Sequence, residues 1–323
     1  MMGALAGMLH GLRSSRALAA KRDIAGTVAA LGYRAGDASA LGDDCAAIPD
    51  GDGYLLFASE GFQDGFVRAM PWFAGYCGVM VNASDIAAMG GRPIAVVDTL
   101  WGETAESAAP ILHGLRDGAR AYGIPVVGGH TNLGSAHCSL SVAILGRARW
   151  LLTSFDARPG EVLVAAIDLR GRWHDPHPFW DASSGLGTSA DAARLRADLE
   201  LLPEIAEAGL SRAGKDISMA GILGTALMLA ECSRIGITID LEAIPRPEGA
   251  PLERWLGAFP SYGYLLTARP ADAEAVLARF RARGIAAAII GSCDGSGRLD
   301  ALWDGARETF WDLGHGPLIG CAP

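Results

Sequence analysis

The chain has 323 residues, half of them hydrophobic, and 27 basic against 36 acidic side chains give it a formal net charge of −9. The length suits two domains of roughly 150 residues each, and the acidity argues against a nucleic-acid or anionic-membrane partner, which would favour a basic surface. Six scattered cysteines without a C-x-x-C pair indicate a reduced, cytoplasmic protein.

The first half of the chain alternates helices with short apolar strands. Strands are expected at 54–59, 93–101, 125–129 and 139–147, from their apolar and β-branched character. Helical periodicity predicts helices over 71–89 and 105–122. The stretch 72–91 is apolar but contains Asn82 and Asp85, which are costly in lipid, so it predicts a buried helix and not a membrane span.

A polar segment rich in Pro and Gly, 152–160, separates this half from a second mixed α and β half. We therefore predict an N-terminal domain over 1–151 and a C-terminal domain over 152–323. The second half has expected helices at 190–208, 218–233 and 271–283, and expected strands at 162–167, 237–241, 263–268 and 286–291.

A long loop, 171–188, contains the aromatic segment Trp173–Asp181. Three interpretations stay open for this segment: a metal site at His174 and His177, an aromatic lid over a ring-shaped substrate, or a packed or disordered loop. We expect the acceptor substrate near this loop and near 259–263.

Adjacent carboxylates follow a glycine at Gly42-Asp43-Asp44, in a turn before an apolar strand. Neighbouring aspartates repel each other unless a cation or hydrogen-bond donors hold them, and Mg²⁺ prefers such oxygen ligands. A solvated Asx-type turn is the alternative explanation. The helix over 71–89 adds Asn82 and Asp85, three residues apart and so on one face. A buried Asp85 requires a metal or local N–H donors.

Two further motifs suit phosphate. In Val126-Val-Gly-Gly-His-Thr131, the glycines Gly128 and Gly129 follow a strand, where backbone N–H groups are open to an anion. In Lys215-Asp-Ile-Ser218, Asp216 or Ser218 is expected to cap the next helix, whose N-terminus also suits an anion. Lys21 and Lys215 are the only two lysines in the chain, and a compact ammonium suits phosphate contacts.

In this order, the motifs resemble the superfamily that includes aminoimidazole ribonucleotide synthase, thiamine-monophosphate kinase and selenophosphate synthetase. The pattern is most similar to its branch of AIR synthase-related proteins. The resemblance covers about Lys21 to Leu299. It implies an α/β (α+β) chain of two domains and a homodimer whose N-terminal sheets pair. It also implies ATP bound with Mg²⁺ in a cleft between the domains.

The resemblance also implies roles for particular residues. Asp43, Asp44, Glu60 and Asp85 would hold metal, and Asp216 would be catalytic. Lys21 and Lys215 are further catalytic candidates, because their charges would neutralise the phosphate groups during transfer. The nucleotide contacts would come from Gly42, Asn82, Gly128, Gly129, His130, Thr131 and Ser218. His130 and Met219 stand where the kinase has acids, which weakens the case for thiamine-phosphate kinase activity.

The resulting expectation is an ATP- and Mg²⁺-dependent enzyme that transfers a phosphoryl group to, or activates, an oxygen of a small metabolite. Two alternatives remain: a nucleotide-binding regulatory protein without catalysis, and a metal-dependent phosphate-ester hydrolase.

Overall fold

The computed structural model describes residues 3–32, 41–185 and 191–320, which form two compact units. One unit, here called the five-stranded unit, comprises Cys45–Trp150 and Ala182–Glu207. The other, the seven-stranded unit, comprises Met1–Asp44, Leu151–Asp181 and Ala208–Pro323. The described residues before Cys45 thus belong with most of the second half of the chain, and the segment Ala182–Glu207 belongs with the first half. Each unit is described by itself.

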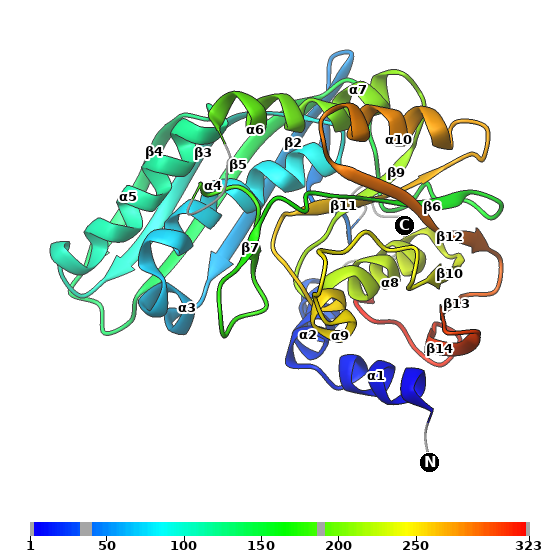
Figure 1. Cartoon of the computed structure of the whole chain (residues 1–323). Helices are drawn as coiled ribbons and strands as arrows, with labels where there is room; N and C mark the ends of the chain where they lie inside the picture. Colours follow the sequence, from blue (N-terminus) through cyan, green and yellow to red (C-terminus); the bar gives the residue numbers. More distant parts are fainter. Residues whose placement is uncertain (1–2, 33–40, 186–190, 321–323) are drawn as a thin grey trace. The chain divides into compact units, whose positions relative to one another are not determined.

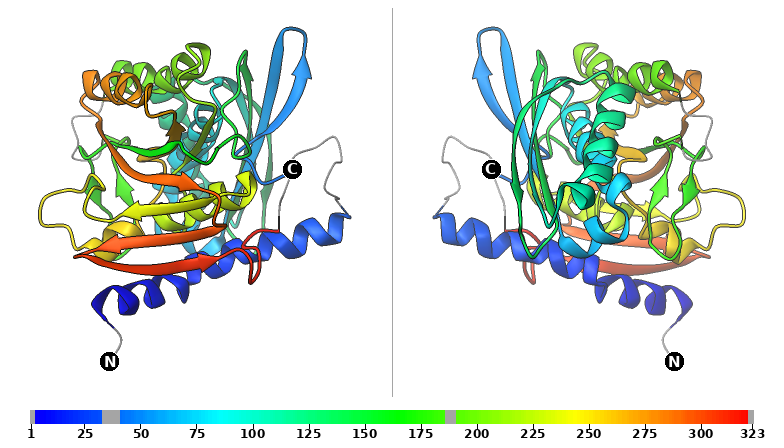
Figure 2. Two further views of the ribbon diagram at one scale, coloured as in Figure 1. Left: turned by 90° about the vertical axis from the view of Figure 1, so that its right-hand side faces the viewer. Right: turned by 90° about the vertical axis from the view of Figure 1, so that its left-hand side faces the viewer.

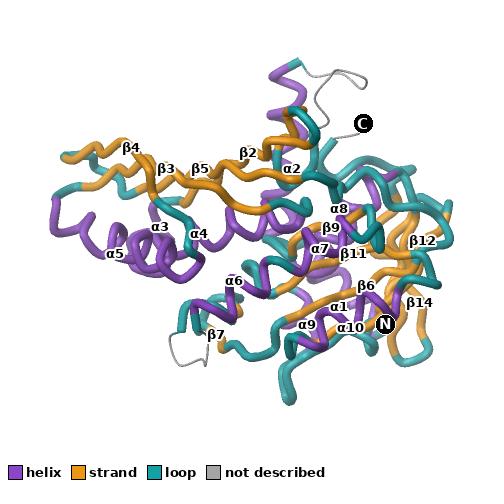
Figure 3. The backbone as a smooth tube through the Cα atoms, turned by 90° about the horizontal axis from the view of Figure 1, so that it is seen from above, coloured by secondary structure: helices purple, strands orange, loops and turns teal. Residues whose placement is uncertain are grey.

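The five-stranded unit is a mixed sheet with helices on one face. Its strands lie in the order β1-β2-β5-β3-β4, in which only β3 and β4 run parallel. In Figure 3, α4 and α5 lie along one face of this sheet. The strands are β1 (Ala46–Asp50), β2 (Gly53–Phe62), β3 (Arg92–Gly102), β4 (Val126–Leu133) and β5 (Ser139–Ala148), and the helices are α3 (Asp64–Ala69), α4 (Pro71–Ala88), α5 (Ala105–Tyr122), α6 (Ala192–Leu199) and α7 (Leu201–Glu207).

Helix α4 is the core of this unit. It begins with Pro71 at its first turn, where the missing N–H costs nothing, and nearly all its side chains are buried. Asn82 donates from Nδ2 to the carbonyl of Gly78 at 2.8 Å and to that of Val142 on β5 at 3.0 Å. The predicted helix over 71–89 is therefore confirmed as a buried helix, tied to the sheet by its own polar residue.

The seven-stranded unit has the strand order β14-β13-β10-β12-β6-β11-β9 and a separate two-stranded hairpin, β7–β8. Helix α1 packs against β14, where Arg13 donates to the carbonyl of Thr309 at 3.0 Å. Figures 1 and 2 show these two elements side by side. The strands are β6 (Val162–Ile167), β7 (Arg172–Trp173), β8 (Trp180–Asp181), β9 (Ala213–Asp216), β10 (Gly236–Asp240), β11 (Gly263–Ala268), β12 (Ala286–Asp294), β13 (Arg298–Trp303) and β14 (Ala306–Asp312), and the helices are α1 (Ala4–Arg13), α2 (Arg16–Leu31), α8 (Gly221–Ser233), α9 (Leu252–Leu256) and α10 (Ala273–Ala282).

The predicted fold class, mixed α and β in two parts, is confirmed. Three details differ from the sequence predictions. The helix expected over 190–208 is two helices, α6 and α7, and residue 190 lies outside the described residues. The loop 171–188 contains the β7–β8 hairpin, although its residues 186–188 are likewise outside the described part. No helix in the described ranges has both the length and the apolar character that a membrane span requires.

Candidate functional site

The paired aspartates lie in a bend before β1, as predicted. Both belong to the seven-stranded unit and accept hydrogen bonds from other residues of it. Gly42 has φ +116°, a left-handed backbone that favours glycine, and so turns the chain into the pair. Both carboxylate oxygens of Asp43 accept from the backbone N–H of Ser154, at 3.1 and 3.0 Å, and Oδ1 also accepts from its hydroxyl at 2.8 Å. Burial raises the pKa of Asp43 to about 6, against the opposing effect of Lys215.

Asp44 is held by the end of β9. Lys215 donates from its ammonium to Oδ1 of Asp44, and the backbone N–H of Asp216 donates to Oδ2 at 3.2 Å. Burial acts to lower the pKa of Lys215, but the carboxylates of Asp44 and Asp43 raise it well above its usual value. Lys215 is therefore a charged ammonium with only 5% of its side chain exposed.

These groups form a buried acidic cluster, defined as Asp43, Asp44, Lys215 and Asp216. Its three carboxylates and one ammonium give the cluster a formal charge of −2. An oxygen of Asp44 and an oxygen of Asp216 lie within 4.8 Å of each other. Hard carboxylate oxygens at this spacing, in an excess of two negative charges, fit a divalent cation such as Mg²⁺.

Lys21 and Ser218 lie together beside this cluster. Lys21, on α2, donates to the hydroxyl of Ser218 at 3.4 Å, and the backbone N–H of Ser218 donates to Oγ1 of Thr225 at 3.4 Å. The prediction that Asp216 or Ser218 caps the following helix is wrong. Asp216 ends strand β9, and α8 begins at Gly221 after Ala220, with no side-chain cap. Lys215 and Asp216 are strand residues, because they still pair with Leu265 and Tyr264 of β11.

The remaining predicted site residues belong to the five-stranded unit. Asp85 is a buried residue of α4, with 6% exposure, and Glu60 is a half-buried residue of β2. The segment Gly128–Thr131 is exposed on β4, the edge strand, and includes His130.

Gly128 and Gly129 do not stand at the end of a strand, as the sequence analysis expected, but within β4. At Gly129 a Cβ would lie 2.4 Å from Oδ1 of Asp98, so close packing against Asp98 accounts for this glycine.

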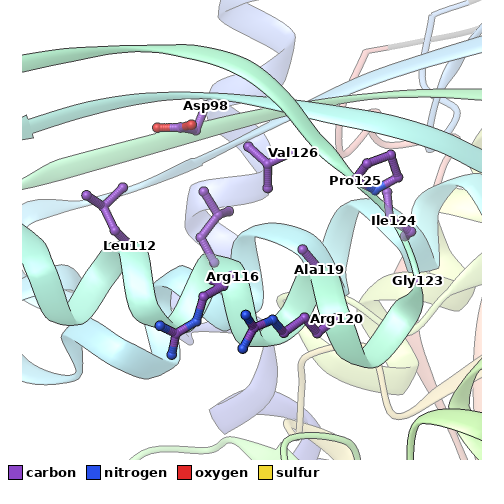
Figure 4. Close-up of a pocket in the computed structure, with 10 residues that line it drawn as sticks. Asp98, Leu112, Arg116, Ala119, Arg120, Gly123, Ile124, Pro125 and Val126 are labelled. Carbon is purple, nitrogen blue, oxygen red and sulfur yellow. The ribbon is translucent and has the colours of Figure 1, made fainter.

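A groove of about 530 Å³ lies between α5 and the strands β3 and β4 (Figure 4). Arg116 and Arg120 of α5 and Asp98 of β3 supply its charged groups. Burial raises the pKa of Asp98. The other lining residues are largely apolar: Leu112, Leu115, Ala119, Gly123, Ile124, Pro125 and Val126.

The aromatic segment Trp173–Asp181 is a packed hairpin. Nε2 of His174 is 3.0 Å from Oδ2 of Asp181, whose side chain is fully buried. The ring of His177 stacks on Phe179 with centroids 5.0 Å apart. Among the interpretations left open by the sequence, the structure favours a packed loop for its described residues.

Ser154 and Asp98 are two residues of these sites that the sequence alone did not predict. Ser154 follows Thr153 in a segment interpreted as a linker, and no local pattern distinguishes it from any other loop serine. Asp98 interrupts the apolar strand 93–101, and a carboxylate in such a strand was the one signal available for it.

Comparison with known proteins adds independent findings. The sequence matches the family described as AIR synthase related protein, with its N-terminal domain over residues 42–148 and its C-terminal domain over 158–304. An uncharacterised protein of Synechocystis sp. is 47% identical over 286 residues, 88% of each chain. Thiamine-monophosphate kinase of Pyrococcus horikoshii is 32% identical over 139 residues, 41% of this chain and 45% of the kinase.

The fold has solved counterparts as well. The structure of Thermotoga maritima PurL complexed with ATP superposes with a TM-score of 0.70 at 21% identity. That match covers 86% of this chain and 46% of the PurL chain, so this chain spans about half the length of that protein. At this identity the likeness concerns the fold alone.

Proposed function

We propose that this chain, which belongs to the AIR synthase related family, is an ATP-using, Mg²⁺-dependent enzyme acting on an oxygen of a small metabolite. The reaction would either transfer the phosphoryl group to that oxygen or activate it for a following step. Relatives that are kinases and synthases, one of them solved with ATP, support the proposal. The observation that carries it is the buried acidic cluster around Lys215.

Phosphoryl transfer requires positioning and charge neutralisation more than a covalent nucleophile. Bound Mg²⁺ would neutralise charge on the phosphate oxygens, with Asp44 and Asp216 as its ligands. Asp43, Glu60 and Asp85 remain ligands predicted from the sequence.

The chain's own cations would contribute directly. Lys215 is fixed by Asp44 and 3.5 Å from the hydroxyl of Ser154, so its ammonium is preorganised. Lys21, through Ser218, would supply a second positive charge to a phosphate group.

The groove of the five-stranded unit supports a nucleotide ligand in a separate way. Apolar walls such as Leu112 and Val126 suit the faces of a base, and the Asp98 carboxyl suits its polar edge. We propose that this groove binds a nucleoside by itself, as a site of the five-stranded unit alone.

Calorimetric titration with Mg²⁺ and the non-hydrolysable analogue AMPPCP tests the cluster. Asp216→Asn keeps the volume of the side chain and removes one negative charge, so we expect binding of the Mg²⁺ complex to weaken by about tenfold or more. The matched control is Asp300→Asn, another buried aspartate of the same unit, which is bound to Arg307 and Thr309 in a structural network. Equal affinity in wild type and Asp216→Asn would refute the assignment.

Release of ADP separates the alternatives. An enzyme of the proposed kind releases ADP from ATP when its acceptor is supplied. A regulatory protein binds AMPPCP but releases no ADP with any acceptor, and a phosphate-ester hydrolase acts without ATP and shows no thermal shift with it.

A further inference from the structure

Two neighbouring hydroxyls are buried in the loop that joins α9 to β11. Neither Oγ of Ser261 nor the phenolic oxygen of Tyr262 has a hydrogen-bond partner among the described residues. An unsatisfied buried hydroxyl costs free energy, and folded proteins rarely leave one without a reason. Two in succession therefore point to a function that the folded chain alone does not supply.

The backbone of the same loop is strained and rigidly held. Ser261 has φ +46°, in the left-handed region that is uncommon for residues other than glycine. The β7–β8 hairpin fixes the loop through Phe259, whose N–H donates to the carbonyl of Pro178 at 3.1 Å, while its carbonyl accepts from the N–H of Trp180 at 2.9 Å. The strain is therefore maintained by surrounding contacts, as is typical of binding sites.

The loop lies alongside the segment that links β9 to α8. Tyr264 of β11 pairs with Asp216, and the N–H of Ile217 donates to the carbonyl of Gly263 at 2.9 Å. At Gly221, the first residue of α8, a Cβ would lie 2.0 Å from the carbonyl oxygen of Leu256. Ser261 and Tyr262 thus lie shortly before Tyr264, the residue of β11 that pairs with Asp216 of the acidic cluster.

We propose that the hydroxyls of Ser261 and Tyr262 bind the acceptor molecule of the reaction, through its uncharged oxygen atoms. The proposal rests on the function proposed above, because an acceptor must lie beside the phosphate group that it receives. Burial raises the pKa of Tyr262, so its hydroxyl stays protonated and available as a donor. A charged group would be costly at this buried position, so we expect the acceptor to present carbonyl or hydroxyl oxygens, as a sugar, an alcohol or an amide does.

Thermal unfolding of Ser261→Ala and Tyr262→Phe tests whether the hydroxyls are structural. If they are reserved for a ligand, removing them leaves the melting temperature of the ligand-free protein unchanged or raises it. The matched control is Ser211→Ala in the same unit, since the buried hydroxyl of Ser211 donates to the carbonyl of Thr267 at 2.7 Å. This control should lower the melting temperature. A similar loss in Ser261→Ala and Tyr262→Phe would overturn the proposal.

A second measurement uses ADP release with ATP, Mg²⁺ and the protein-free small-molecule fraction of a bacterial extract as the probe. We expect that fraction to stimulate the wild type, and the stimulation to fall about tenfold in each variant through loss of one hydrogen bond, while AMPPCP affinity is unchanged. Full stimulation of both variants would refute the acceptor site and leave the proposed function standing. Absence of ADP release from the wild type would refute the proposed function itself, and the acceptor site with it.

Discussion

Glu231 lies near the end of α8, with 7% of its surface exposed. A negative charge there opposes the helix dipole, so it requires compensation. Three consecutive backbone N–H groups provide it: Leu318 donates to the carboxylate at 2.6 Å, Ile319 at 3.1 Å and Gly320 at 2.8 Å. One side chain therefore fixes the C-terminal segment, in which Leu318 and Ile319 are each 1% exposed.

Glu231→Gln should destabilise the protein, because a glutamine offers one oxygen and one NH₂ group where three donors converge. Loss of charge-assisted hydrogen bonds in a buried position predicts a decrease of about 2–4 kcal/mol in the free energy of unfolding. Urea denaturation would measure it. As a control, Glu274→Gln changes a glutamate whose side chain is 76% exposed, and its stability should match the wild type. If Glu231→Gln were as stable as the wild type, Glu231 would not be what holds the C-terminal segment.

Residue patterns in the sequence predicted the acidic pair together with Lys215 and Asp216, but not Ser154. Asp43 and Asp44 are adjacent, so their mutual repulsion is visible locally. Ser154 is 111 residues from Asp43, and Glu231 is 87 residues from Leu318. Contacts between residues so far apart in the sequence are set by tertiary packing, and the periodicity of a single segment does not predict them.

At the scale of elements, the contact of α4 with α5 depends on glycine. A Cβ at Gly114 would lie 1.8 Å from the carbonyl oxygen of Trp72, and one at Gly75 would lie 1.9 Å from that of Ile111. The two helix backbones therefore approach more closely than any larger residue permits. Trp72 then reaches across and donates from Nε1 to Asp117 at 3.0 Å.

Gly114→Ala should separate these helices and destabilise the five-stranded unit. The methyl group would meet backbone atoms, which cannot rotate away, so overpacking predicts a loss of about 1–3 kcal/mol in the free energy of unfolding. Gly26→Ala in α2 is the matched control, since a Cβ there meets nothing within 4 Å. It should stabilise by roughly 0.5–1 kcal/mol from helix propensity. Equal shifts in the two variants, measured by urea denaturation, would disprove the packing argument.

Element prediction succeeded where burial is periodic. The strand β5, for example, alternates fully buried with half-buried residues and was predicted nearly to its ends. It failed at β9, β13 and β14. Residues 213–216 are a short run that includes Lys215 and Asp216, and β14 is exposed over its first four residues, two of them charged, so neither has an apolar pattern. These strands are formed by pairing with neighbours and not by their own composition.

At the scale of the whole molecule, the five-stranded sheet has a face that no helix of its unit covers in the described part of the chain. Leu56, Val96 and Leu100 point to the helices and are at most 1% exposed. The alternate residues Phe57, Val97 and Trp101 are 50%, 41% and 37% exposed on the opposite face. On β5, Leu145 lies opposite Phe57 and Ala143 lies opposite Val97. Because Ala143 and Leu145 are two residues apart on one strand, Phe57 and Val97 share that face.

We therefore expect the chain to form a homodimer through this face, in keeping with the sheet pairing that the sequence resemblance implies. Large exposed apolar side chains on one face of a sheet are typical of an interface, and two-fold symmetry lets one surface pair with its own copy. Val97→Asp would place a carboxylate at the centre of that interface, where it would be buried without a counter-ion. Light scattering coupled to size exclusion should then show a dimeric wild type and a monomeric variant.

The control for this substitution must add the same charge to another exposed apolar residue. Leu31→Asp does so, because Leu31 is 65% exposed at the end of α2, in the other unit. Its molar mass should remain that of the wild type. If Leu31→Asp dissociates the protein and Val97→Asp does not, the subunits associate through α2 and not through the sheet. A wild type that is monomeric at micromolar concentration would contradict the expected dimer.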